Sequence, residues 1–169
     1  MITAERIKYL LDLQPLPVEG GFFAEMYRSE EVLPDVVLPD RYIGERPFST
    51  AIYYLLEPDT CSVMHRLTSD EIYHFYLGDP VEILLLYPDG TGEVKVIGTD
   101  LEHGIYPQLV VPRGVWQGAH LIPGGKFAFM GTTLAPGFDH HDFELGHRIE
   151  LLETYPANDF GHLIVELTR

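Results

Sequence analysis

Apolar residues recur along the chain with two different spacings, and the first of these is helical. Ile7, Leu10 and Leu11 stand three and four positions apart, which places them on one face of a helix. Thr3 belongs to the residue types that cap a helix N-terminus, and Pro15 does not fit a helix interior. The pattern predicts one short amphipathic helix at the start of the chain.

After the turn residues of PLPVEGG, short runs rich in Val, Ile, Tyr and Phe are separated by breaks such as TSD, GDP and APG. Strands without long helices between them are typical of an antiparallel sandwich or barrel, not of a βαβ sheet. The PDG break at 88–90 predicts a hairpin. Strands are expected at 22–28, 49–56, 61–67, 71–77, 81–87, 93–97, 105–111, 115–122 and 126–134.

Two stretches fall outside this strand pattern. Residues 30–47 contain three prolines and mixed charge, which is typical of a long surface loop. In the tail beyond Phe138, HRIELLETYP at 147–156 favours one or two helical turns, and GHLIVEL at 161–167 favours a last strand. We therefore expect an irregular C-terminal segment.

A chain of 169 residues with a hydrophobic fraction of 46 % can bury one sizeable core. We expect a single domain over residues 1–169, with the barrel at about 20–137. The longest apolar run, at 83–87, is far shorter than the roughly 20 residues that cross a bilayer. The N-terminal residues lack the apolar stretch and cleavage site of a secretory signal, so we expect a cytoplasmic protein.

Composition argues against several classes of function. The net charge of −15, from 26 acidic against 11 basic residues, is spread along the chain without a basic block. Nucleic acids and anionic membranes are recognised through Lys and Arg contacts to phosphate, so neither is an expected partner. Cys61 is the single cysteine, which excludes an internal disulfide and a cysteine-based zinc finger.

The stretch HRLTSDEIYHFYLGDP, from His65 to Pro80, concentrates the residues that could carry chemistry. If strands 61–67 and 71–77 form a hairpin across the tight TSD turn, His65 and Glu71 face each other. An imidazole and a carboxylate so placed suit a transition metal, general acid–base catalysis or a buried hydrogen bond. The pair alone does not decide between these three.

The spacing of these residues resembles the first motif of the cupins, G-x5-H-x-H-x3,4-E-x6-G. His65, Glu71 and Gly78 occupy its His, Glu and closing Gly positions. The second cupin motif, G-x5-P-x-G-x2-H-x3-N, is similar to PRGVWQGAHL, where Pro112 and Gly114 supply the Pro-x-Gly turn. The gap between the two motifs and the all-β pattern around them also fit.

More narrowly, PVEGGFFAEMYRS, STAIYYLL, HRLTSDEIYHFYLGDP, VVPRGVWQGA and APGFDHHDFEL resemble the Cupin 5 group, formerly a domain of unknown function (DUF985). This resemblance spans nearly the full length of the chain. It implies an all-β double-stranded β-helix, or jelly-roll barrel, with a ligand cavity inside it. It also implies a homodimer.

Two positions depart from the pattern of metal-binding cupins, whose ligands are His, His, Glu and His. Carried over residue by residue, this set becomes His65, Leu67, Glu71 and Gln117. Leu67 cannot ligate a metal, and the Gln117 amide is a weak donor for a transition metal. No cofactor is firmly predicted, and the candidate site for a divalent transition metal is the incomplete set of His65, Glu71 and Gln117.

Strand alternation sorts the neighbouring side chains between two faces. Tyr73 and Phe75 share the parity of Glu71 and are expected to point into the barrel, where Leu67 and Gln117 should line the same cavity. Such an interior, with an imidazole, a carboxyl, an amide, a phenol and apolar walls, suits a small molecule such as a sugar derivative.

Other polar residues are expected to be peripheral. Glu19, in the sequence VEGG, is a candidate for the rim of the pocket. His74 and His120 have the opposite parity and are expected to point out of the barrel. The histidines of GFDHHDFELGH are expected in a solvated loop that Phe138 and Phe143 anchor to the barrel.

Three functions fit these residues. The first is a metal-independent sugar epimerase or isomerase, with His65 as base, Glu71 orienting it and Tyr73 as proton donor. The second is a protein that binds a small ligand with the same groups and does not turn it over. The third is a metal-dependent oxidoreductase or decarboxylase. The cupin fold serves all three, so the fold by itself cannot choose.

Overall fold

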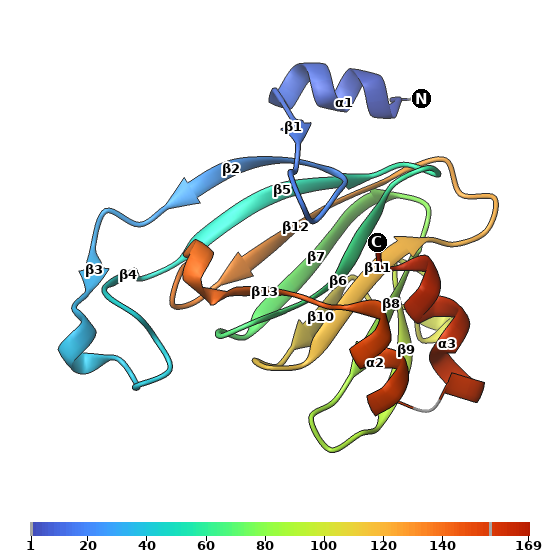
Figure 1. The fold of residues 1–169 in the computed structure, drawn as a ribbon. Coiled ribbons are helices and arrows are strands. Elements are labelled where there is room, and N and C mark those ends of the chain that lie inside the picture. Colours follow the sequence, from blue (N-terminus) through green and yellow to red (C-terminus); the bar gives the residue numbers. More distant parts are fainter. Residues whose placement is uncertain (1, 156) are drawn as a thin grey trace.

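Side chains that alternate along short strands build two antiparallel sheets that face each other across the core (Figure 1). The computed structural model describes residues 2–155 and 157–169. These facing sheets confirm the predicted all-β barrel. The six-stranded sheet contains, in order, β1 (Gln14–Pro15), β2 (Phe22–Arg28), β5 (Thr50–Leu56), β12 (Ala128–Leu134), β7 (Glu71–Gly78) and β10 (Gln108–Val111). The five-stranded sheet contains β13 (Phe143–Leu145), β6 (Cys61–Leu67), β11 (Trp116–Leu121), β8 (Val81–Leu86) and β9 (Gly92–Ile97).

The predicted strands agree closely with the observed ones. Strands 22–28 and 61–67 begin and end where they were expected. The hairpin on PDG is confirmed, because β8 pairs with β9 around Gly90, whose positive φ suits glycine. The strand expected from 105 begins instead at Gln108, directly after a proline that cannot donate to the ladder.

The predicted hairpin between strands 61–67 and 71–77 is wrong. β6 pairs with β11 and β13 in the five-stranded sheet, whereas β7 pairs with β12 and β10 in the six-stranded sheet. The short TSD turn is therefore a corner at which the chain crosses from one sheet to the other. As a result, β6 and β7 lie on opposite walls of the barrel.

The main hydrophobic core lies between the sheets and follows the alternation of the strands. Along β7, Glu71, Tyr73 and Phe75 are buried while Ile72 and His74 are only half-buried. Tyr73 and Phe75 join a cluster of buried side chains from both sheets. Their inward orientation agrees with the parity of the sequence.

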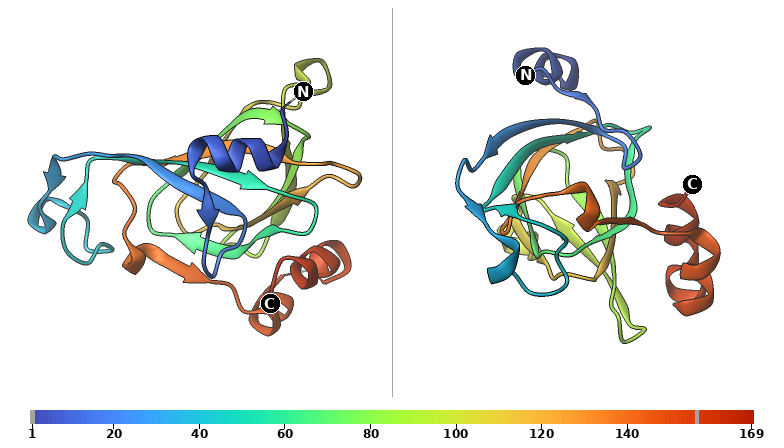
Figure 2. Two further views of the ribbon diagram at one scale, coloured as in Figure 1. Left: turned by 90° about the horizontal axis from the view of Figure 1, so that it is seen from above. Right: turned by 60° about the vertical axis from the view of Figure 1, so that its left-hand side comes forward.

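The expected N-terminal helix is present as α1 (Ala4–Leu11), and the Thr3 hydroxyl accepts a hydrogen bond from the Arg6 backbone N–H at its start. Ile7 is buried against Leu55 and Phe129 on the outer face of the six-stranded sheet. One edge of that face is therefore covered by the start of the chain (Figure 2).

Two helices, α2 (Arg148–Thr154) and α3 (Ala157–Glu166), cover the outer face of the five-stranded sheet (Figures 1 and 2). The helical turns expected from 147 onward are confirmed as α2, although Pro156 lies outside the described residues. The strand predicted at 161–167 is wrong. Leu163, Ile164 and Leu167 recur at helical spacing and pack on the sheet, so the segment is the end of α3 and the residues after it.

The loop predicted at 30–47 carries little regular structure. It contains the two-stranded sheet of β3 (Val32–Leu33) and β4 (Arg46–Pro47) and a 3₁₀ turn at Asp35–Val37. Two further 3₁₀ turns lie at Leu101–His103 and His140–Asp142. Among the described helices, none has the length and apolar character needed to cross a membrane.

The packing of α3 is testable with two isoleucines. Ile164, on the face of α3 that packs against the five-stranded sheet, is fully buried, whereas Ile149 on α2 is 71 % exposed. We expect Ile164→Ala to lower the free energy of unfolding by about 2–5 kcal/mol, because it leaves a cavity. Ile149→Ala should change it by no more than about 0.5 kcal/mol. Urea unfolding curves measure both values, and equal effects would contradict the helical packing of this segment.

Candidate functional site

A cavity lies between the two sheets, at the end of the barrel where β5 begins and β12 ends. Its volume is about 90 Å³, and apolar side chains form most of its wall. The polar groups that reach it come from both sheets and from the turn before β2. They are Glu19, Glu25, Thr50, Tyr54, His65, Glu71 and Thr132.

His65 lies on β6, and contacts of its side chain fix the orientation of the ring. Its ring is buried, and Nδ1 lies 2.8 Å from the Val63 carbonyl oxygen. Because a carbonyl oxygen can only accept, Nδ1 carries the proton and Nε2 keeps the lone pair in the neutral ring. Phe143 stacks on the imidazole, with ring centroids 5.1 Å apart and planes 16° from parallel. The nitrogen able to take a proton is thus defined by the fold.

Glu71 begins β7 on the opposite wall. Its carboxyl is buried, and the Gln117 amide Nε2 donates to its Oε2 at 2.7 Å. Burial raises the pKa of Glu71 above its ordinary value, and interactions with His65 and Gln117 offset this only in part. The protonated form is therefore more favoured than in an exposed carboxyl.

His65 and Glu71 line the same cavity although they do not face each other across a hairpin. They come from the five-stranded and the six-stranded sheet, respectively. A ligand in the cavity would lie against both walls. The two groups still interact, because the charge of His65 lowers the pKa of Glu71.

Glu19 reaches the cavity because the VEGG turn docks against β6. Val18 and Gly20 have positive φ, and a Cβ on Gly20 would collide with the Cys61 carbonyl oxygen. The Glu19 carbonyl accepts a hydrogen bond from the Val63 N–H, and its carboxylate accepts one from Ser62. The predicted position of Glu19 at the pocket agrees with the structure.

The other predicted pocket residues divide into two groups. Leu67 lines the cavity, as expected. Gln117 is buried behind the Glu71 carboxyl, and Tyr73 and Phe75 lie deeper in the core. Tyr73 and Phe75 stand two and four residues further along β7 than Glu71, away from the cavity, and the amide of Gln117 is hydrogen-bonded to Glu71.

Sequence reasoning missed most of the apolar wall. Phe138 and Phe143 were expected only to anchor a loop, yet both line the cavity. Phe23, Ile52 and Leu134 complete much of the remaining wall. The aromatic residues of GFDHHDFEL were the available signal, but nothing in the sequence places them beside His65.

Residues 5–146 match the family described as Cupin superfamily (DUF985), Cupin_5. The chain belongs to this cupin family. The facing antiparallel sheets are its double-stranded β-helix. The first motif falls on β6 and β7, and the second on the turn before β11 and on β11 itself.

Several proteins are similar to this cupin. The crystal structure of protein SO0799 from Shewanella oneidensis is 33 % identical, with a TM-score of 0.85 over 100 % of this chain and 99 % of that chain. The uncharacterized protein YML079W of Saccharomyces cerevisiae is 32 % identical over 133 residues, which make up 73 % of this chain and 66 % of that protein. Oxalate decarboxylase from Bacillus subtilis is 13 % identical, with a TM-score of 0.52 over 92 % of this chain and 37 % of that chain. This last likeness shows the fold alone.

The cupin metal-ligand pattern does not fit a transition-metal centre in this chain. Leu67 presents an apolar side chain to the cavity, and the Gln117 amide nitrogen is turned to Glu71. Residues 2–155 and 157–169 contain no group of three or more His, Cys, Asp or Glu side chains that could hold an ion. His65 and Glu71 are therefore the two strong donors that remain of the cupin set.

The remaining strand histidines lie outside the barrel. His74 Nε2 is 3.0 Å from the Thr133 hydroxyl on the outer face of the six-stranded sheet. His120 lies on the outer face of the five-stranded sheet, with its ring nitrogens 3.2 Å from Glu82 and 3.3 Å from Glu166. Both positions agree with the alternation of the sequence.

A buried ion pair joins the loop before β5 to the segment before β13. Arg46 is 1 % exposed, and its Nε and Nη2 donate to the two carboxylate oxygens of Asp142, each at 2.8 Å. Its Nη1 donates to the carbonyl oxygens of Ile43, Gly44 and Glu45. The guanidinium is therefore neutralised and hydrogen-bonded on every side.

This ion pair also positions the site. Asp142 immediately precedes Phe143, the residue that stacks on His65. The loop that carries Arg46 thus holds one wall of the cavity from a distance of 96 residues along the chain.

The buried carboxyl makes stability depend on pH. Because burial raises the folded-state pKa of Glu71 above its ordinary value of 4.5, its contribution to stability is present at low pH. That contribution is lost as the pH rises from 4.5 through the folded-state pKa. Glu71→Gln keeps an oxygen for the Gln117 amide and removes the charge. We expect the variant to melt higher than wild type at pH 7 and the gap to close toward pH 4. A lower melting temperature at pH 7 would show that the ionised carboxyl stabilises the fold.

The two arginine–carboxylate pairs near the site should differ in strength. Arg46→Met leaves Asp142 buried without a partner, and we expect a loss of about 3–5 kcal/mol in the free energy of unfolding. Arg66→Met breaks the Arg66–Glu144 pair, whose side chains are 39 % and 56 % exposed, so the loss should be at most about 1 kcal/mol. Urea unfolding of both variants provides the comparison. Similar losses would contradict the role assigned to Arg46.

Proposed function

We propose that this cupin is an enzyme that epimerises a small hydroxylated carbonyl compound by proton transfer, without a metal. One observation supports this most strongly: His65 and Glu71 reach the same cavity from opposite walls. Two-base epimerisation needs a base on one face of the substrate carbon and an acid on the other. The pair supplies groups suited to these two roles.

The hydrogen bond of each group suits its role. His65 Nε2, opposite the protonated Nδ1, removes the proton from the carbon beside the carbonyl, and the electron pair of the C–H bond moves into the carbonyl to form an enolate. Glu71, in which burial favours the protonated carboxyl, delivers its proton to the other face of that carbon. Afterwards His65 is an imidazolium and Glu71 a carboxylate, and exchange with solvent restores both.

Tyr73 is not needed in this mechanism. It lies in the core, and burial raises the pKa of its phenol well above the ordinary value. Glu71 takes the role of proton donor that the sequence suggested for Tyr73. The backbone carbonyl of Val63, instead of Glu71, orients the imidazole.

The cavity favours a small uncharged substrate. Its volume of about 90 Å³ is well below the roughly 300–1,000 Å³ of pockets that hold drug-sized ligands. The carboxylates of Glu19 and Glu25 would repel an anion and can accept hydrogen bonds from hydroxyl groups. Leu67 and Phe143 offer apolar contact to the carbon chain.

Binding of the same ligand class without turnover is the alternative function, and it uses the same residues. The metal-dependent oxidoreductase or decarboxylase has less support because the donor set is short. The homodimer and the cytoplasmic location that the sequence suggested remain predictions.

Hydrogen exchange in D₂O tests the proposal. A panel of small aldoses, ketoses and 2-hydroxy carbonyl compounds is first screened for ligands that raise the melting temperature. For a stabilising ligand we expect loss of the C–H signal beside the carbonyl in ¹H NMR spectra. His65→Ala should slow that exchange by about 10²–10⁴-fold, because the base is lost.

His74→Ala is the matched control, because His74 lies on the outer face of the six-stranded sheet. The His74→Ala variant should exchange the C–H hydrogen of the ligand at the wild-type rate. Exchange that is unchanged in His65→Ala would refute the assignment of the base. A ligand that stabilises the wild-type protein without any exchange or product would establish the binding alternative.

A further inference from the structure

Three arginines line a groove on the outside of the barrel, separate from the cavity. The groove has a volume of about 330 Å³ and lies where the end of β6, the turn between β10 and β11, and residues 141–144 meet. Leu67 and Phe143 line both the groove and the cavity, so the two are neighbours across one wall. The arginines are Arg41, Arg66 and Arg113.

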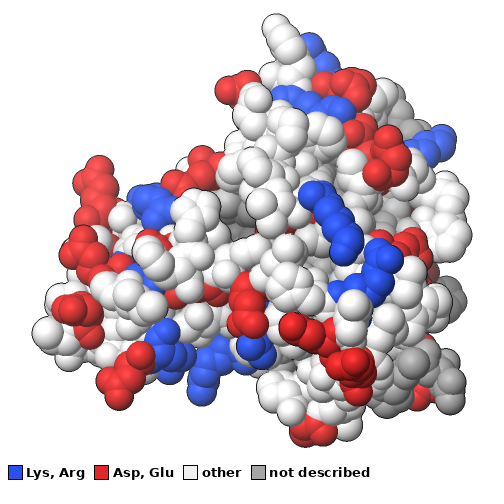
Figure 3. Space-filling model, viewed as in Figure 1, with Lys and Arg blue, Asp and Glu red and all other residues white. Residues whose placement is uncertain are grey.

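This concentration of positive charge contrasts with the rest of the chain, which has 26 acidic and 11 basic residues. Figure 3 shows a group of blue side chains along the lower edge of the face drawn, near the ends of β6 and β10. Three of the 11 basic residues therefore serve one groove. A local excess of positive charge on an otherwise acidic protein favours the binding of an anion there.

Two of the arginines have no carboxylate partner. Among residues 2–155 and 157–169, neither Arg41 nor Arg113 forms an ion pair. Arg66 is bound by Glu144 through two hydrogen bonds of 2.7 and 2.9 Å. Asp70 is also close, and its carboxylate accepts a hydrogen bond from the Arg113 backbone N–H.

The remaining acid in the groove is already neutralised. Asp142 is bound by the buried Arg46, which leaves it little capacity to attract the groove arginines. The lining contains three guanidinium groups and two carboxylates, and the neighbouring Arg46 and Asp70 add one charge of each sign. The groove lining is therefore positive.

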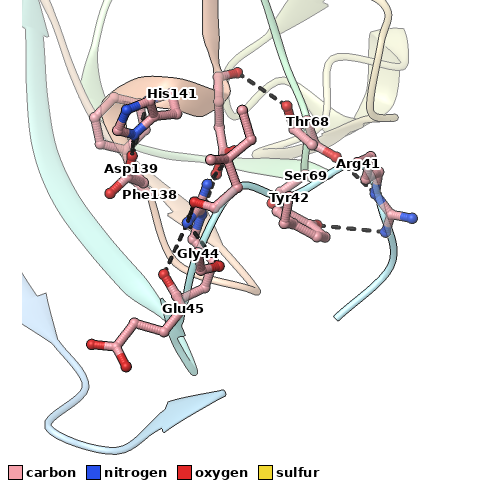
Figure 4. A network of polar contacts seen from close by, with 12 residues as sticks. Arg41, Tyr42, Gly44, Glu45, Thr68, Ser69, Phe138, Asp139 and His141 are labelled. Atoms are coloured by element: carbon pink, nitrogen blue, oxygen red, sulfur yellow. Dashed lines mark hydrogen bonds and ion pairs between the residues drawn. The ribbon is translucent and has the colours of Figure 1, made fainter. Parts of the chain in front are cut away.

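Two of the three guanidinium groups, those of Arg41 and Arg66, are held in place before any ligand arrives. Arg41 donates from Nε to the Thr68 carbonyl oxygen at 3.3 Å and lies 4.7 Å from the centre of the Tyr42 ring (Figure 4). The Tyr42 hydroxyl is in turn 3.0 Å from the buried Ser69 hydroxyl. Arg66 lies 4.4 Å from the centre of the Trp116 ring. Ordered arginines lose less conformational freedom on binding.

We propose that this groove binds a phosphate group, either as inorganic phosphate or as a phosphomonoester. Planar guanidinium forks match the oxygen geometry of phosphate and form charge-assisted hydrogen bonds to it. Arg41 and Arg113 make the main contacts. Arg66 joins them when it releases Glu144. The site is independent of the acid–base reaction proposed for the cavity.

Binding is measured by isothermal titration calorimetry at low ionic strength, where screening is weak. Inorganic phosphate is the first probe and glycerol 3-phosphate the second, so that the two sources of the group are distinguished. We expect saturable binding of at least one probe. Arg41→Gln and Arg113→Gln should each weaken it by about tenfold or more.

Two further variants separate local contacts from overall charge. Arg6→Gln changes the net charge equally, but Arg6 is exposed on α1 and does not line the groove. Its affinity for phosphate should stay close to that of wild type. Glu144→Gln frees Arg66 and removes a negative charge, so binding should tighten several-fold.

Three results would overturn the proposal: no saturable binding of either probe by the wild-type protein, an equal loss in Arg6→Gln, or weaker binding in Glu144→Gln. Melting temperatures of all four variants show whether each has remained folded. Hydrogen exchange in D₂O tests the proposed function of the cavity separately. If no exchange is seen, the measured binding of phosphate to the groove still stands.

Discussion

The burial of the Glu71 carboxyl between two sheets is the constraint on which the rest of the site depends. An ionised carboxylate in this position loses its hydration, and the hydrogen bond from Gln117 replaces only part of it. The protein meets this cost by favouring the protonated form. An apolar residue of similar size would fit the surrounding core with less cost. The acid role proposed for Glu71 would account for a carboxyl at this position.

On the wall formed by the five-stranded sheet, the orientation of the His65 ring is also fixed, but by other contacts. His65 is fixed by a backbone carbonyl on one side and an aromatic ring on one face. That ring belongs to Phe143, whose position depends on the buried pair of Arg46 and Asp142. A loop and a C-terminal segment that are distant in sequence thus determine where one imidazole nitrogen points. Loss of that ion pair would disturb the site as well as the fold.

The sequence predicts the strands and the facing of their side chains well, because period-two alternation is a local property. It places Tyr73 inward and His74 outward correctly. It fails where a partner strand decides the outcome. The corner between β6 and β7 has the length of a hairpin turn, yet hydrogen bonding sends the two strands into different sheets. GHLIVEL carries an apolar run that suits a strand, and packing on the five-stranded sheet makes it helical.

For the candidate site, too, the sequence identifies some residues, and only the tertiary structure identifies the others. The cupin spacing identifies His65 and Glu71, and the absence of a second histidine at Leu67 indicates the incomplete metal set. The apolar wall and the proton on Nδ1 follow from tertiary contacts that no local pattern contains. Phe143 stands 78 residues after His65, and only the pairing of β13 with β6 brings the two rings together.

The most direct test of the central claim is heteronuclear NMR spectroscopy of the His65 ring and the Glu71 carboxyl in the wild-type protein. The ¹⁵N shifts of the neutral imidazole should show a protonated Nδ1 and an unprotonated Nε2. The ¹³C shift of the carboxyl should titrate with a midpoint above the ordinary value of 4.5. A neutral ring protonated at Nε2, or a carboxyl that titrates at or below 4.5, would contradict the assignment of base and acid.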